Sequence, residues 1–80
     1  MSGAIHIASL IVRTRPVEGE AVAQELARLS GAEVHAVQDG KIILVLEGES
    51  ERELAERMDL IRSEAGVLLV SLVYHEVEGA

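Results

Sequence analysis

The 80-residue sequence contains no cysteine, tryptophan or phenylalanine, and Tyr74 is its single tyrosine. Without cysteine there is no thiol nucleophile, disulfide framework or zinc-thiolate site. Seven basic residues stand against fourteen acidic ones, which gives a net charge of -7 that repels phosphate backbones. Nucleic acid bases would also find almost no aromatic ring to stack on. We therefore expect no nucleic acid partner, and a basic peptide suits this charge better.

Long hydrophobic runs are also missing. The longest aliphatic stretches, residues 42–46 and 67–70, have the length of strands, far below the roughly 18 apolar residues of a membrane span. The first sixteen residues carry no basic region ahead of their apolar stretch, so they do not read as a secretory signal. We expect no membrane span and a cytoplasmic protein.

Hydrophobic patterning predicts four strands. The Asp39-Gly40 pair tolerates the positive φ angles of a two-residue turn and predicts a hairpin between the second and third strands. The last five residues read as a polar tail. The four runs rich in β-branched residues cover residues 5–14, 32–38, 41–47 and 67–75.

Two helices are expected between these strands. Pro16 suits the first turn of a helix of about fifteen residues, which Gly31 would follow. Ser50 and Glu53 form a capping-box pattern for a second helix, expected to run to about Ala65. The order β-α-β-β-α-β with short connections predicts an α+β fold, the ferredoxin-like plait. Its four-stranded antiparallel sheet has the order 4-1-3-2 with both helices on one face, and residues 1–80 form one such domain.

Alternation along each strand divides its side chains between the helix-covered core and an open face. The inward set is His6, Ala8, Leu10, Val12, Val34, Ala36, Ile42, Leu44, Leu46, Leu68, Val70 and Leu72, with Tyr74 as a further candidate. Polar residues identify the outer set, which also contains Arg13, Val37 and Lys41. The predicted site residues on this open face are Ile5, Ile7, Ser9, Ile11, Glu33, Ile43, Val45, Glu47, Leu69, Ser71, Val73 and His75, and His35 shares the face without being one of them.

This outer set is too apolar for a face that only meets water. Seven of the predicted site residues are isoleucine, valine or leucine, enough for a contiguous patch of the kind that marks an interaction site. Packing of two such sheets against each other explains the composition equally well. A slip of one residue in a strand would instead place part of this set in the core.

No constellation typical of catalysis or metal binding is found. His6, His35 and His75 fall on three different strands, and none has a second ligand at a metal-binding spacing. Ser9 and Ser71 have no histidine and carboxylate placed to activate them. We expect no catalytic residue, no metal and no other cofactor.

The fourth strand carries a recognisable string. GVLLVSLVYHEVE resembles the C-terminal strand of NapD-type proteins, where a G-V-L-x-x-S-L-V-Y-H sequence is characteristic. The segment Ser9 to Val12 resembles the family's S-L-V-V, and Gly31, Glu33 and Val34 match its G-x-E-V segment. The resemblance covers about residues 6 to 76.

The resemblance implies a small cytoplasmic chaperone with the ferredoxin-like fold. NapD-type proteins bind the twin-arginine signal peptide of the periplasmic nitrate reductase catalytic subunit, which holds back export until its cofactors are inserted. By this hypothesis the peptide lies on the apolar open face, Ser9, Ser71 and His75 supply polar contacts, and Glu33 and Glu47 attract the arginines. The protein would be a monomer or weak dimer and would not be an enzyme. The alternative is a dimeric ACT-like domain that binds an amino acid effector.

Overall fold

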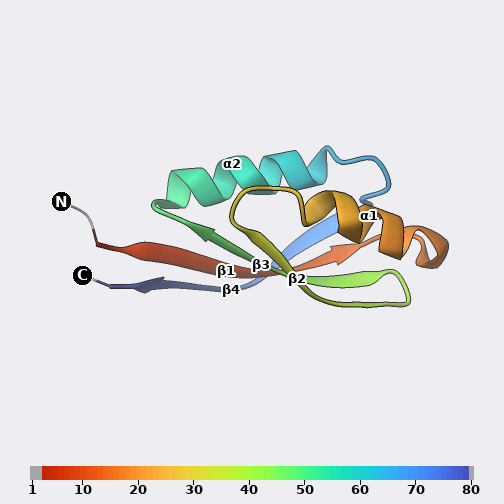
Figure 1. Ribbon diagram of the computed structural model, residues 1–80, viewed down its shortest axis with the longest axis horizontal. Coiled ribbons are helices and arrows are strands. Elements are labelled where there is room, and N and C mark those ends of the chain that lie inside the picture. The colour runs from red at the N-terminus through yellow and green to blue at the C-terminus, as the bar shows by residue number, and fades with distance from the viewer. Residues whose placement is uncertain (1–2, 80) are drawn as a thin grey trace.

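The computed structural model describes residues 3–79 and has the expected fold. One antiparallel sheet has the order β2-β3-β1-β4, and both helices cover the same face of it (Figure 1). This confirms the ferredoxin-like plait and its strand order. The elements are β1 (Ile5–Arg13), α1 (Gly19–Leu26), β2 (Ala32–Gln38), β3 (Lys41–Gly48), α2 (Glu51–Arg62) and β4 (Leu69–Glu78).

The first helix is shorter than expected. Pro16 opens a 3-10 turn, Pro16–Glu18, and α1 then ends at Leu26. Gly31 does not cap the helix, because Ala27 is its C-cap residue. The Gly31 carbonyl instead accepts a 2.8 Å hydrogen bond from the Glu47 amide of β3. The residues after Leu26 therefore form a turn that leads into the sheet.

The hairpin between β2 and β3 forms as predicted. Asp39 and Gly40 both have positive φ angles, 53° and 77°, the combination that suits the twist of a two-residue hairpin. The Thr14 amide donates a 2.8 Å hydrogen bond to the Gly40 carbonyl. A Cβ on Gly40 would collide with the Thr14 carbonyl oxygen, so glycine is required here for space as well as for φ.

The second helix begins where its capping pattern predicts. The Ser50 hydroxyl accepts a 3.1 Å hydrogen bond from the Glu53 amide, while the Glu53 carboxylate accepts from the Glu49 amide at 3.4 Å. The expected end near Ala65 is wrong, since α2 ends at Arg62. The Ser63 hydroxyl donates to the Asp59 carbonyl at 2.9 Å, which closes the last turn.

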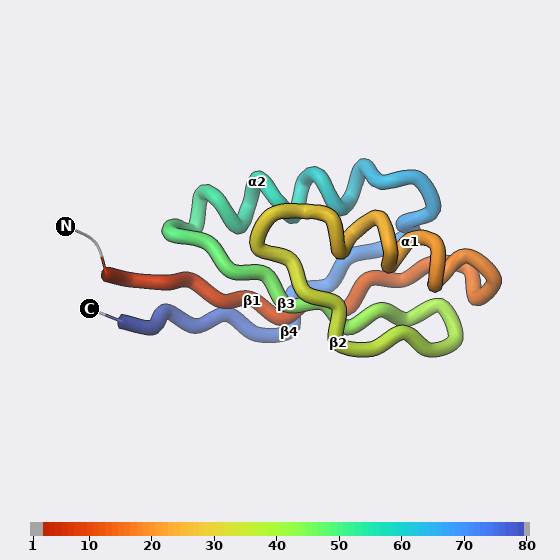
Figure 2. The backbone as a smooth tube through the Cα atoms, viewed as in Figure 1, coloured from red at the N-terminus to blue at the C-terminus, as the bar shows by residue number. Residues whose placement is uncertain are grey.

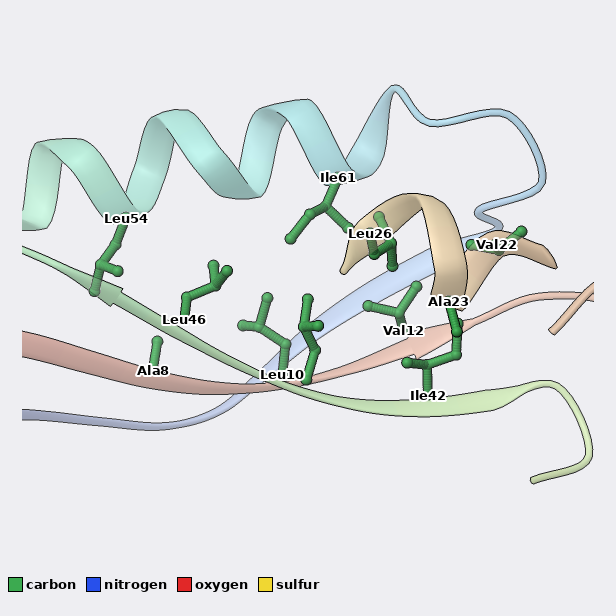
Figure 3. Close-up of a cluster of buried hydrophobic side chains, with 11 residues drawn as sticks. Ala8, Leu10, Val12, Val22, Ala23, Leu26, Ile42, Leu46, Leu54 and Ile61 are labelled. Atoms are coloured by element: carbon green, nitrogen blue, oxygen red, sulfur yellow. The ribbon is translucent and has the colours of Figure 1, made fainter. Parts of the chain in front are cut away.

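The hydrophobic core lies between the helices and the sheet (Figure 3). The inward residues predicted for β1 and β3 are confirmed, apart from His6, which is only half-buried. Side chains from α1 and α2 complete this layer. The buried cluster is Ala8, Leu10, Val12, Val22, Ala23, Leu26, Ile42, Leu44, Leu46, Leu54 and Ile61.

A bulge in β2 reverses part of the predicted face assignment. Val34 pairs with Leu44 and Ala36 with Ile43, so His35 is an extra residue. The prediction that Ala36 faces inward is therefore wrong. Val37 pairs with Ile42 and packs against the core, so its predicted outward orientation is also wrong.

A second bulge changes the far half of β4. Leu10 pairs with Leu72 but Ser9 pairs with Tyr74, which leaves Val73 without a partner in β1. Tyr74 therefore shares the open face with Ser9, and the inward orientation considered for it is wrong. His75 pairs with Ala8 on the helix side, so the prediction that it faces outward is wrong too.

The edge position of β4 explains the remaining differences. Leu68 precedes β4 and is 64% exposed, whereas Leu72 faces the helix side but is still 53% exposed. The helices do not cover these side chains, and Val70 is the β4 residue that packs on the core. Residues 76–78 pair with residues 5–7 of β1, so they belong to the sheet and not to a polar tail. Strands β1 and β4 thus run together past α2 toward the termini (Figure 2).

Candidate functional site

The open face of the sheet is the strongest candidate site, and strand register arranges its side chains in rows. At one end Ile7 lies between Glu47 of β3 and Glu76 of β4. Ile5 lies beside Glu78 in the preceding position of this face. The three later rows are Glu33-Val45-Ser9-Tyr74, Ala36-Ile43-Ile11-Ser71 and Gln38-Lys41-Arg13-Leu69.

The middle of this face is apolar and uncovered. Ile7, Ile11, Ile43 and Val45 are half-buried by their neighbours within the sheet, and both helices lie on the other side (Figure 1). Leu69 extends the apolar surface to the β4 edge and is 55% exposed. Such a surface in a small domain is typical of a site that binds a partner.

The two ends of the face carry opposite charge. Glu47, Glu76 and Glu78 surround the isoleucines at the start of β1. Arg13 and Lys41 are paired with each other at the opposite end. The apolar middle therefore lies between an acidic end and a basic end.

The acidic end brings carboxylates close enough to affect each other's protonation. A hydrogen bond with Glu76 is the main cause that raises the pKa of Glu78, and the charges of Glu76 and Glu47 raise it further. The pKa of Glu76 is lowered because Glu78 and then Tyr74 hydrogen-bond to it. The bond with Glu76 in turn raises the pKa of the Tyr74 hydroxyl. This mutual proximity makes the acidic end a favourable place for a cation.

The structure places most of the predicted site residues together. His35 projects near Glu33 of the same strand, with 3.7 Å between its Nε2 and a Glu33 carboxylate oxygen. Val73 is the extra residue of the β4 bulge and is 60% exposed. His75 faces the helix side of the sheet and so does not belong to the open face. Strand pairing assigns ten of the predicted site residues to the open face, namely Ile5, Ile7, Ser9, Ile11, Glu33, Ile43, Val45, Glu47, Leu69 and Ser71.

On β2, sequence reasoning missed Ala36 and Gln38 of this face. On β4 it missed Tyr74, Glu76 and Glu78. Their alternation in the sequence indicates one shared face, but the polar tail interpretation ended the strand at His75. Among residues 3–79 no three metal-ligating side chains come together, and no helix in that range is long and apolar enough to cross a membrane.

Known proteins share this sequence and this fold. Residues 5–79 match the family model described as NapD protein. The chain is 42% identical over 73 residues to the "Chaperone NapD" of Paracoccus pantotrophus, across 91% of this chain and 65% of that protein. It is 36% identical over 76 residues to the "Chaperone NapD" of Escherichia coli K12, across 91% of this chain and 86% of that one. The chain thus spans just under two thirds of the length of the first relative and most of the second.

A solved structure agrees with these relatives. The solution structure of the E. coli Tat proofreading chaperone protein NapD superimposes with a TM-score of 0.86 at 30% sequence identity, covering 94% of this chain and 80% of that one. The relatives are chaperones, which favours a binding protein over an enzyme or an ACT-like effector domain. On this combination of matched sequence and matched fold, the chain belongs to the NapD family of chaperones.

Proposed function

We propose that this chain is a cytoplasmic chaperone that binds the twin-arginine signal peptide of the periplasmic nitrate reductase catalytic subunit. Binding is stoichiometric and holds back export until the cofactors of the cargo are inserted. Residues 1–80 act as one ferredoxin-like domain, as a monomer or weak dimer. The names of the relatives, "Chaperone NapD" and "Tat proofreading chaperone", support this assignment.

The observation that carries the proposal is the order of surfaces along the open face. A twin-arginine signal peptide has a basic segment followed by an apolar segment. The face offers Glu47, Glu76 and Glu78 at one end, followed by an apolar middle that includes Ile11 and Ile43. Charge complementarity of this kind fixes the orientation of a bound peptide. The arginines therefore lie at the end where β1 starts.

The length of the apolar surface suits a short segment of signal peptide. The rows from Ile7 to Arg13 are three two-residue steps apart, or roughly 20 Å at a rise near 3.3 Å per residue. A helix of about 13 residues covers the same distance at 1.5 Å per residue. An amphipathic helix laid on the face would contact the four half-buried aliphatic residues with one side, in the manner of helix-in-groove recognition.

Carboxylates suit arginine better than lysine in this role. The guanidinium group donates two parallel hydrogen bonds to one carboxylate, which the single ammonium of lysine does not reproduce. Glu47 and Glu76 flank Ile7 from opposite sides, so each arginine has a carboxylate of its own. Arginines held in this way are hidden from the export machinery.

A calorimetric titration tests the proposal. The full chain is titrated with the twin-arginine signal peptide of a periplasmic nitrate reductase and, in parallel, with a twin-lysine version of that peptide. We expect submicromolar binding to the first peptide and weaker binding to the second, because the charge is kept while the paired hydrogen bonds are lost.

Two protein variants locate the site. Ile43→Asp places a charge in the middle of the open face and should abolish binding. Leu60→Asp is the matched control, because Leu60 lies on α2 and is 56% exposed. Equal loss in both variants, or full binding by Ile43→Asp, would place the peptide elsewhere. Absence of binding to either peptide by the unmodified chain would refute the proposed function.

A further inference from the structure

Two histidines meet on the helix side of the sheet, away from the open face. His6 of β1 lies opposite Val77, and His75 of β4 lies opposite Ala8, so the two rings are diagonal neighbours on adjacent strands. The distance from His6 Nδ1 to His75 Nε2 is 3.2 Å. The ring centroids are 5.4 Å apart and the ring planes are inclined by 27°. One nitrogen of each ring therefore faces the other.

This spacing matches the requirement of a chelated metal ion. Two nitrogen–metal bonds of about 2.0–2.1 Å that meet near the tetrahedral angle hold their nitrogens about 3.3–3.4 Å apart. The two nitrogens already lie at 3.2 Å, so small rotations of the rings direct both lone pairs to one point. We propose that His6 and His75 form a two-histidine chelate for a divalent transition-metal ion of the zinc, nickel and copper group, whose members favour imidazole ligands.

Open space adjoins one member of the pair, His75. His75 lines a hollow of about 160 Å³ together with Glu51, Leu54, Met58 and Leu72. Glu51 contributes negative charge to this hollow. The hydrogen bond between the two rings is the contact that the ion replaces, and it needs a proton on one of the facing nitrogens. Metal binding moves that proton to the outer nitrogen of the same ring.

The coordination sets the expected strength of the site. No three histidine or acidic side chains within residues 3–79 converge on one point, so water completes the coordination of the ion. A chelate of two ligands binds more strongly than either ligand alone because the second bond forms within the same molecule. We therefore expect a micromolar dissociation constant, weaker than that of a structural zinc site with four protein ligands.

A metal ion here would join the ends of β1 and β4. These ends extend beyond α2 (Figure 1), and the register connects residues 5–8 with residues 75–78. An ion that binds only the folded chain raises its stability. The signal peptide is proposed to bind the opposite face, so the metal site does not depend on that proposal.

Calorimetric titration of the full chain without a histidine tag, using Zn²⁺ and then Ni²⁺, tests the site. We expect one ion per chain, and His6→Gln or His75→Gln should each weaken binding about a hundredfold, because the chelate becomes a single ligand. His35→Gln is the matched control, since His35 is the exposed extra residue of the β2 bulge, and β2 lies at the opposite edge of the sheet from β4. It should bind the ion as the unmodified chain does.

Thermal unfolding gives a second readout. The ion should raise the melting temperature of the unmodified chain and of His35→Gln, and should leave His6→Gln and His75→Gln unchanged. Circular dichroism of each variant without metal establishes that it is folded. Full binding by either of the two ligand variants, or equal loss in His35→Gln, would overturn the assignment. Failure of the unmodified chain to bind at millimolar metal would do the same.

Discussion

The two faces of the same sheet are built from nearly the same residue types and behave differently. Leu10 and Leu44 on the helix side are fully buried, whereas their neighbours in the sequence, Ile11 and Ile43, are half-buried on the face that the helices leave open. Hydrophobicity alone therefore does not distinguish the core from the open face. The difference lies in what surrounds each apolar set, since helices cover one and charged ends frame the other.

Substitutions at neighbouring positions of β3 give the largest expected effect. Leu44→Ala removes a fully buried side chain and should lower the free energy of unfolding by about 2–5 kcal/mol. Ile43→Ala should cost clearly less stability because its side chain is half-buried, but it should weaken peptide binding. Urea unfolding and peptide titration of both variants measure this. A similar stability loss in the two variants would show that the open face is part of the core.

Removing charge from the acidic end tests whether its carboxylates contribute to peptide binding. The triple variant Glu47→Gln, Glu76→Gln, Glu78→Gln should bind the twin-arginine peptide about tenfold more weakly. Its stability should change little, because Glu47 and Glu78 are exposed and Glu76 is half-buried, so water screens their charges. Salt should weaken peptide binding by the unmodified chain more than by this variant.

A matched variant shows whether position or net charge matters. Glu20, Glu25 and Glu56 lie on the helices and are exposed. Replacing these three by glutamine makes the same change in net charge on the opposite side of the sheet. An equal loss of affinity in both triple variants would mean that the acidic end is not a specific site for the arginines.

A substitution at the N-cap of α2 should lower stability, by less than the core substitution, and leave peptide binding unchanged. Ser50→Ala removes the hydroxyl that accepts from the Glu53 amide and should lower the free energy of unfolding by about 1 kcal/mol. Peptide affinity should stay the same, since the cap lies on the helix side. Ser50→Asp restores an acceptor and should recover the stability, which urea unfolding checks.

The sequence predicts the fold and the side-chain faces of the regular strands. The wrongly predicted side-chain orientations have one physical source. Strands β1 and β3 pair without a register shift, so simple alternation identifies their faces. Strands β2 and β4 each contain a bulge, and the extra residue reverses alternation beyond it. Neither bulge is marked by a glycine, because His35 and Val73 are the extra residues. The predicted orientations of Ala36, Val37, Tyr74 and His75 are wrong for this reason.

The smallest expected effect is a dependence of peptide binding on pH. In the free protein a hydrogen bond with Glu76 raises the pKa of Glu78. A bound arginine favours the charged carboxylate, so affinity should fall as pH falls through the raised pKa of Glu78. Titration at several pH values measures this dependence. Glu78→Gln should flatten it, and an unchanged dependence in that variant would assign it to another group.

The free energy of unfolding should depend on pH less than peptide affinity does, because the pKa shifts of Glu76 and Glu78 have opposite signs. The raised pKa of Glu78 gives a stabilising contribution that is present at low pH and lost as pH rises through that pKa. The lowered pKa of Glu76 gives one that is present above its unfolded value and lost as pH falls. The two contributions partly cancel in the folding equilibrium of the free chain. An arginine bound at the acidic end would favour the charged form of both carboxylates, so the peptide equilibrium should report the acidic end more directly than unfolding does.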